Sequence, residues 1–199
     1  MMIIEKTAVP QGVLPLDEFK LHLRLGTGFS DGDIQEPVLE SFLRAALAAV
    51  EARTGKILIS RDFAWASEQW RDPAGQVLPL APVRAVVDVV LRDATGAETT
   101  VSPATYRLEK HVHRPVLRPI GAALPTVPTH GEVEVTLTAG MATEWEGLPA
   151  DLSHAVLLLA AHYYEYRHET GLSEGCMPFG VSSLIERYRD IRIFAGRGQ

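Results

Sequence analysis

The spacing of apolar residues changes twice along this chain of 199 residues, and this change limits the possible folds most strongly. Over residues 33–54 and 149–169, apolar side chains recur every three or four positions, which is the period of an amphipathic helix. Between residues 57 and 140 the period is two, as in strands with one buried face. The pattern predicts an α+β fold in which helices from both ends of the chain form the core and the middle of the chain is a β-rich insertion.

Four helices are expected, over residues 16–25, 33–54, 149–169 and from about residue 181 onward. Asp33 and Glu36 have the spacing of a capping pair at the start of the second helix, and Gly55 ends it. Pro149 suits the first turn of the third helix, because its missing N–H has no intrahelical partner there. These signals predict a bundle of about four helices.

The insertion is expected to be a small antiparallel sheet or barrel. Residues 132–138 alternate Glu or Thr with Val or Leu, and residues 57–66 also alternate. Val86–Leu91 is rich in β-branched residues and reads as a continuously buried strand. Most of the prolines lie between these runs, where the missing N–H donor does not interrupt a central ladder.

The same signals divide the chain into segments. Residues 1–15 contain Pro10, Gly12 and Pro15 without sustained periodicity, so they are expected to form a flexible arm. The helical core is expected over residues 16–56 and 141–194. The β-rich insertion is expected over residues 57–140, and a short flexible tail over residues 195–199.

Charge and composition exclude several classes of protein. Lysines and arginines number 19 against 25 aspartates and glutamates, a net charge of −6, whereas wrapping of nucleic acid requires clustered basic residues. The single cysteine cannot form an internal disulfide, so the fold does not require an oxidising compartment. No apolar run reaches the ~18 residues of a membrane span, and no signal peptide is recognised. We therefore expect synthesis in the cell interior and no membrane partner.

One pair of histidines raises an alternative function. His111 and His113 are two residues apart, so on a strand they would point to the same side and could chelate a metal ion. This pair favours, as the alternative, a small metal-dependent enzyme or ligand-binding module. However, no nearby cysteine or clear third ligand follows, and no other group of residues matches a catalytic frame. The sequence therefore predicts a protein that is not an enzyme and needs no cofactor or metal.

A longer series of motifs carries a family resemblance. Ala139-Gly140 precedes a linker and the helix L-P-A-D-L-S-H-A-V, and a loop separates that helix from P-F-G-V-S-S-L-I-E-R-Y-R. Upstream, D-G-D-I, V-E-A-R-T-G, I-L-I-S-R-D-F-A-W and the hairpin D-A-T-G-A-E follow in order. Together these motifs cover about residues 30–190. In their co-linear order they resemble the head–tail connector (adaptor, or head-completion) proteins of tailed bacteriophages and phage-derived gene transfer agents.

The resemblance implies a structural role in the neck of a virion or gene transfer agent particle. Copies are expected to form a ring, twelve-fold by resemblance, that docks beneath the portal protein, extends the DNA channel and joins head to tail. The implied partners are the portal, the next tail-proximal connector or stopper ring, and further copies of the chain. DNA is expected to pass through the channel without sequence-specific binding.

The C-terminal segment supplies the candidate interface. Leu184, Tyr188 and Ile191 form one apolar stripe, which is explained by closure of the subunit's own core. Beyond that stripe, arginines are mixed with apolar side chains, a composition that protein interfaces favour. The candidate residues for binding the portal are Arg187, Arg189, Arg192, Ile193, Phe194 and Arg197.

Overall fold

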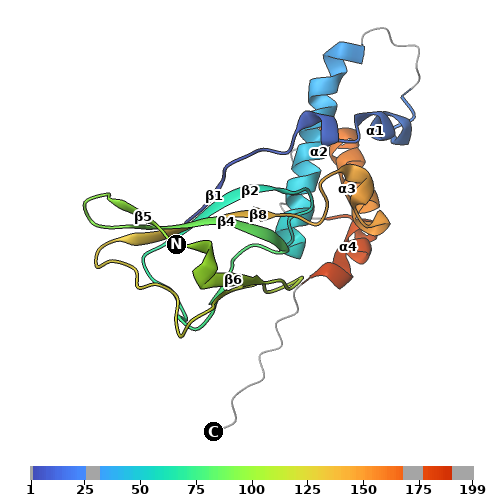
Figure 1. Ribbon diagram of the computed structural model, residues 1–199. Helices are drawn as coiled ribbons and strands as arrows, with labels where there is room; N and C mark the ends of the chain where they lie inside the picture. Colours follow the sequence, from blue (N-terminus) through green and yellow to red (C-terminus); the bar gives the residue numbers. More distant parts are fainter. Residues whose placement is uncertain (1, 26–31, 168–176, 190–199) are drawn as a thin grey trace. The chain divides into compact units, whose positions relative to one another are not determined.

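The chain folds into two compact units, shown in Figure 1. The computed structural model describes residues 2–25, 32–167 and 177–189. One unit, rich in strands, comprises residues 1–14 and 56–148, and the other, helical, comprises residues 15–55 and 149–199. Helices from both sides of the β-rich region therefore belong to the same unit. The predicted α+β class is confirmed.

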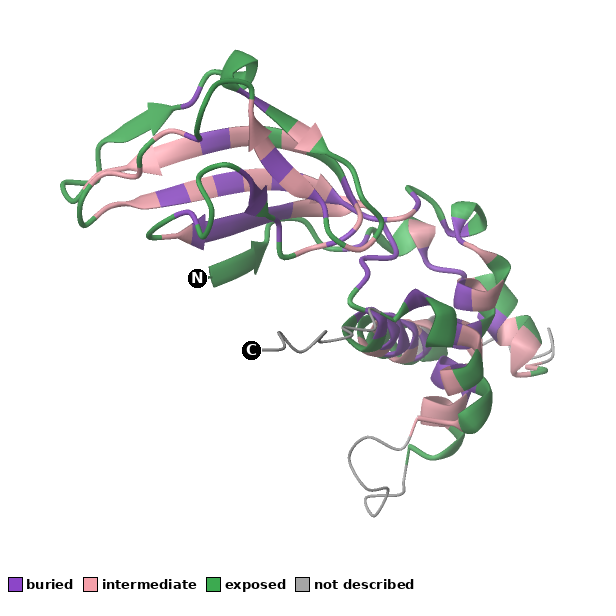
Figure 2. Cartoon of the chain, turned by 90° about the horizontal axis from the view of Figure 1, so that it is seen from below, coloured by how far each residue is buried: buried purple, intermediate pink, exposed green. Residues whose placement is uncertain are grey.

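The larger sheet of the β unit has five antiparallel strands in the order β1-β2-β8-β4-β5. These strands are β1 (Met2–Glu5), β2 (Arg61–Ser67), β8 (Glu132–Ala139), β4 (Val83–Arg92) and β5 (Glu98–Thr100). In the central strand β8, buried and half-buried residues alternate strictly, as the sequence predicts. Figure 2 shows this alternation along the strands.

A second sheet of three strands completes the core of the β unit. Its order is β3 (Gln76–Val77), β7 (Val116–Pro119) and β6 (Tyr106–Glu109). Leu117 of β7 and Tyr106 of β6 belong to the same buried cluster as Trp65 of β2 and Val135 of β8. Because residues from both sheets share one apolar cluster, burial of this surface stabilises the two sheets together.

The structure corrects the expectation of a flexible arm at the start of the chain. Residues 2–5 form β1, which pairs with β2 in a register that places Ile3 opposite Trp65. The chain continues through a short 3₁₀ turn, η1 (Gln11–Val13), and the flanking Val9 and Leu14 are buried. Pairing with the distant strand β2 satisfies backbone N–H and C=O groups of residues 2–5. The local sequence predicted no partner for these groups.

Strand β4 also differs from its prediction. The run Val86–Leu91 was expected to be continuously buried, but Val89 is buried whereas Val87 is 55% exposed. The register shifts between Val83 and Ala85 and again between Val86 and Asp88. Such bulges turn side chains toward different surroundings, so β-branched composition does not report burial at each position.

The helical unit is built from α1 (Leu16–His22), α2 (Gly32–Thr54), α3 (Ala150–Glu165) and α4 (Phe179–Ile185). Helix α3 packs against the other three helices. Small and branched side chains on its buried face, including Ala155, Val156 and Leu159, match the buried Leu43 and Leu47 of α2. Complementary burial of amphipathic faces holds the helices together.

Two boundaries differ from the sequence-based ones. Helix α3 ends at Glu165, while the expected helix continued to residue 169. Residues 141–148 group with the β unit rather than with the helices. There the Ser60 N–H donates to the Ala142 carbonyl at 2.7 Å, and a 3₁₀ turn, η3 (Trp145–Gly147), follows.

Candidate functional site

The described part of the C-terminal segment lies against the helical unit. Helix α4 is followed directly by one 3₁₀ turn, η4 (Glu186–Tyr188). Val181, Ile185 and Tyr188 are buried, whereas Leu184 is only half-buried. Ile191, the last residue of the predicted stripe, lies outside the described residues. The buried stripe accounts for the attachment of α4 to its own unit.

A polar cluster, which we call the Asp151 latch, ties the end of this segment to the start of α3. It consists of Asp151, Arg187 and Tyr188. The Tyr188 hydroxyl donates a hydrogen bond to Asp151 Oδ1 at 2.7 Å, and Arg187 Nε lies 2.9 Å from Asp151 Oδ2. Arg187 also donates to the Tyr188 oxygen and lies over its ring at 4.7 Å. Asp151 therefore anchors the segment 37 residues further along the chain.

Burial raises the pKa of the Tyr188 phenol, and its hydrogen bond from Arg187 acts in the opposite direction. The phenol therefore stays protonated at neutral pH and donates to Asp151. A group whose folded pKa is raised stabilises the fold below its unfolded pKa of about 10. That contribution is lost as the pH rises through the folded pKa, so the Tyr188 hydrogen bond weakens in strongly alkaline solution.

Removing this hydroxyl tests the latch. Tyr188→Phe keeps the buried ring but removes the donor to Asp151, so we expect the free energy of unfolding to fall by about 1 kcal/mol. The loss should be measured by urea denaturation at pH 7 and should shrink above pH 10. Tyr164→Phe is a suitable control in the same unit, because Tyr164 contacts Phe42 and Arg167 through its ring and its backbone carbonyl. An unchanged stability in Tyr188→Phe would contradict the latch.

The other candidate residues have different surroundings. Arg189 lies 3.4 Å from Glu186, three residues earlier, with its side chain 46% exposed. An exposed ion pair of this kind contributes little to stability, so it leaves Arg189 accessible to a partner. Arg192, Ile193, Phe194 and Arg197 lie outside the described residues. Arg187 therefore makes a contact within the subunit that holds it in place, whereas the ion pair of Arg189 is weak.

The two histidines of the alternative function were expected on a strand, but the structure does not place them on one. They lie in the loop between β6 and β7, where His111 Nδ1 accepts hydrogen bonds from the backbone N–H groups of His113 and Arg114, at 3.1 and 3.0 Å. This use of His111 Nδ1 closes the turn. Among the residues that the structure describes, no three His, Cys, Asp or Glu side chains are placed to hold a metal ion. The geometry therefore explains His111 and His113 as residues that stabilise this loop.

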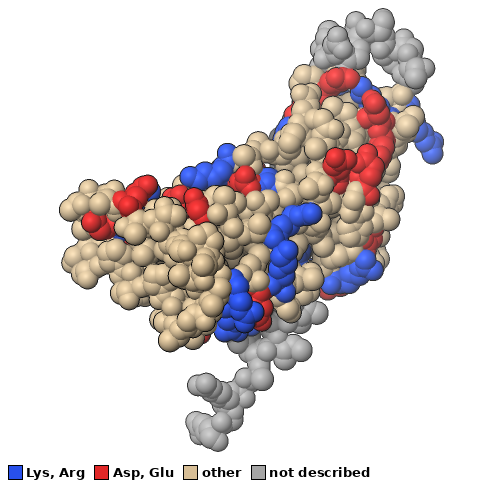
Figure 3. Space-filling view, viewed as in Figure 1, with Lys and Arg blue, Asp and Glu red and all other residues tan. Residues whose placement is uncertain are grey.

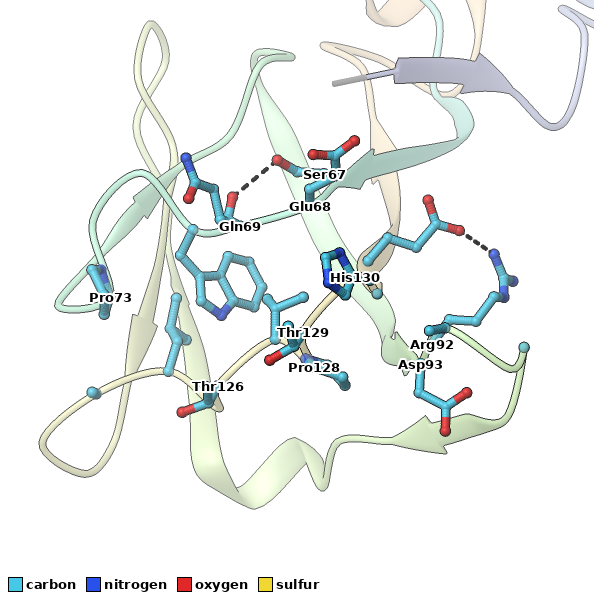
Figure 4. A pocket seen from close by; sticks show the side chains of 18 residues that line it. Ser67, Glu68, Gln69, Pro73, Arg92, Asp93, Thr126, Pro128, Thr129 and His130 are labelled. Carbon is cyan, nitrogen blue, oxygen red and sulfur yellow. Dashed lines mark hydrogen bonds and ion pairs between the residues drawn. The ribbon is translucent and has the colours of Figure 1, made fainter.

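An open hollow of about 1230 Å³ lies on the β unit (Figure 4). Several of its charged groups make structural contacts: Arg92 pairs with Glu132 and with Glu98 of β5. Asp93 accepts bonds from Thr95 and from the Ala97 N–H, and these bonds lower the pKa of its carboxyl group. The predicted D-A-T-G-A-E hairpin is held by this carboxylate. Ser67 and His130 both line the hollow, but the Ser67 hydroxyl donates to the backbone carbonyl of Gln69 at 2.9 Å and is therefore not paired with a base.

Sequence reasoning missed one exposed surface. Met2, Ile3 and Ile4 of β1 are 55, 40 and 43% exposed, at the edge of the five-stranded sheet. Their apolar character is visible in the sequence, but their place at a sheet edge depends on pairing with β2. Within the described part of the chain, no helix is long and apolar enough to cross a membrane.

Solved structures supply the comparison with known proteins. Over the full length of both chains, this protein is 51% identical to a chain in the neck of an empty GTA (gene transfer agent) particle computed with C6 symmetry, with a TM-score of 0.89. It is 50% identical, with a TM-score of 0.85, to one in the virion of a native gene transfer agent particle. A chain in the neck of a native particle computed with C12 symmetry is 47% identical, with a TM-score of 0.83. No protein-family model and no curated protein matches the chain.

The shared fold and the sequence identity of 47 to 51% over the full length define this protein as a structural, non-enzymatic component of the particle neck. The chain belongs to the head–tail connector family of tailed phages and gene transfer agents. The predicted family, its connector role and its place in the neck are confirmed.

Proposed function

We propose that copies of this chain assemble into a closed ring, twelve-fold by family resemblance, that docks beneath the portal and joins the head to the tail. The observation that carries this proposal is the full-length similarity to chains of necks computed with C6 and C12 symmetry. Cyclic symmetry requires each copy to present two different surfaces to its neighbours.

The ring would extend the channel through which DNA passes. The net charge of −6 supports this role, because a wall of like charge does not hold the duplex as it slides. On the face drawn in Figure 3, basic and acidic side chains form separate small groups instead of one continuous basic surface. We therefore expect passage of DNA without sequence-specific binding.

Portal docking is assigned to the C-terminal segment. Arg189, Arg192 and Arg197 would pair with acidic groups of the portal, while Ile193 and Phe194 would enter apolar pockets. Arg187 would contribute indirectly, because the Asp151 latch fixes where this segment leaves the helical unit. The opposite end of the ring would receive the next tail-proximal connector or stopper ring.

Particles made without this protein provide the test. Filled heads should accumulate unattached to tails, and restoring the protein should restore joined particles, as counted by electron microscopy. Images of the restored neck should show a cyclic ring of this chain in contact with the portal. Joined particles in the absence of the protein, or a neck in which the chain forms no ring, would overturn the proposal.

A further inference from the structure

Strand β1 is an edge of the five-stranded sheet, and among the residues that the structure describes no further strand pairs with it. All four of its residues are exposed, and three of them, Met2, Ile3 and Ile4, are apolar. Natural sheet edges are normally blunted by proline, a bulge or outward charges, because free N–H and C=O groups recruit further strands. None of these devices is present within β1, and its one charged side chain, Glu5, pairs with Arg61 at 2.9 Å. An apolar edge left open in this way fits a partner strand.

The hydrogen bonds of β1 show which backbone groups remain for that partner. The Lys6 N–H donates to the Asp62 carbonyl at 2.8 Å, so the backbone of residue 6 points toward β2. In an antiparallel pair this direction alternates along the strand. Residues 2 and 4 therefore also point toward β2, whereas Ile3 and Glu5 direct their N–H and C=O groups away from the sheet. The β1 edge offers two donors and two acceptors.

The opposite edge of the same sheet, strand β5, offers an equal number of free backbone donors and acceptors. In β5, the Val101 N–H donates to the Val89 carbonyl at 2.8 Å, and the Asp93 N–H donates to the Ala97 carbonyl at 3.0 Å. By the same alternation, residues 97, 99 and 101 point toward β4. Glu98 and Thr100 direct their N–H and C=O groups outward, and all three residues of β5 are exposed.

We propose that the β1 edge of one copy pairs with the β5 edge of the next copy, so that the sheets of neighbouring subunits join around the ring. This inference rests on the proposed ring and names the surfaces that form it. A ring uses head-to-tail contacts between two different surfaces. The two free edges of one sheet are such surfaces, and each carries two outward residues.

Strand direction makes this contact repeatable. The five strands are antiparallel throughout, so the first and the last, β1 and β5, run in the same direction. Neighbours related by a small rotation would therefore bring β5 and β1 together in parallel, an arrangement that mixed sheets accept at their edges. Pairing of β1 with β1 of another copy would instead be antiparallel and two-fold, and it would stop at a dimer.

Cysteine cross-linking distinguishes these arrangements. In a Cys176→Ser background, Ile3→Cys is combined with Thr99→Cys or Thr100→Cys, and assembled particles are oxidised and examined on non-reducing gels. A ladder of covalent multimers longer than a dimer is expected from one of the two combinations. The matched control combines Ile3→Cys with Val112→Cys, which is 54% exposed but lies in the β6–β7 loop, and should give no ladder.

Absence of a ladder, or dimers alone, from particles whose necks contain the ring would overturn this inference while leaving the proposed function intact. A backbone variant provides a second test. Ile3→Pro removes an outward N–H but no bond of the β1–β2 ladder, so incorporation into the neck should fall more than tenfold with an unchanged melting temperature. Ile3→Val keeps the donor and should incorporate normally. Normal incorporation of Ile3→Pro would contradict the edge pairing, and if that variant melts lower, the cross-linking result decides.

Discussion

A chain truncated before Ile193 is expected to fold normally yet to bind the portal well over tenfold more weakly. Central interface residues commonly carry about 2 kcal/mol each, and about 1.4 kcal/mol corresponds to a tenfold change in affinity. Loss of the anchors Ile193 and Phe194 together with Arg197 therefore exceeds that factor. Folding should survive, because Val181, Ile185 and Tyr188 remain buried and the Asp151 latch is retained. The measurements are portal affinity, head–tail joining and thermal melting.

Matched substitutions separate a docking role from a general loss of apolar surface. The double variant Ile193→Ala plus Phe194→Ala should reproduce most of the docking defect. The control Ile120→Ala plus Leu21→Ala removes apolar side chains at positions 61 and 74% exposed that lie outside the C-terminal segment, and should join heads to tails normally. Full portal affinity in the truncated chain would move the contact to the β unit or to the start of the chain.

Gly140→Ala should lower the free energy of unfolding by about 3 kcal/mol or more. Gly140 has a φ of +151°, and an added Cβ would lie 2.3 Å from Ser60 Cα and 2.5 Å from Ser60 N. These contacts are with backbone atoms near the start of β2, which cannot move aside as a flexible side chain can. Urea denaturation monitored by tryptophan fluorescence reports this change, because Trp65 and Trp70 lie in the core of the β unit.

The control for this substitution is Gly121→Ala. Gly121 belongs to the same unit, its φ lies outside the positive region, and an added Cβ would meet nothing within 4 Å. Its stability should stay within about 0.5 kcal/mol of the parent protein. Equal stability of Gly140→Ala and Gly121→Ala would show that the chain does not pass Ser60 as closely as the structure describes.

Elements with strong local periodicity were predictable from the sequence. Helix α2 has an apolar stripe from Leu39 to Val50, and β8 alternates over its whole length, so each pattern specifies its own structure. The family resemblance also came from the order of sequence motifs, without knowledge of contacts. It was sufficient to assign a connector role, which full-length similarity to neck proteins confirms.

Contacts between distant residues were decided only by the tertiary structure. Residues 2–5 form a strand because β2, about sixty residues away, offers a free edge, and Val87 is exposed because bulges shift the register of β4. Asp151 reads in the sequence as a charge at a helix start, yet it binds Tyr188 from another helix. Local periodicity determines which face of a segment is apolar. Which residues pack against that apolar face depends on contacts between residues that are far apart in the chain. The free sheet edges and the Asp151 latch are therefore visible only in the tertiary structure.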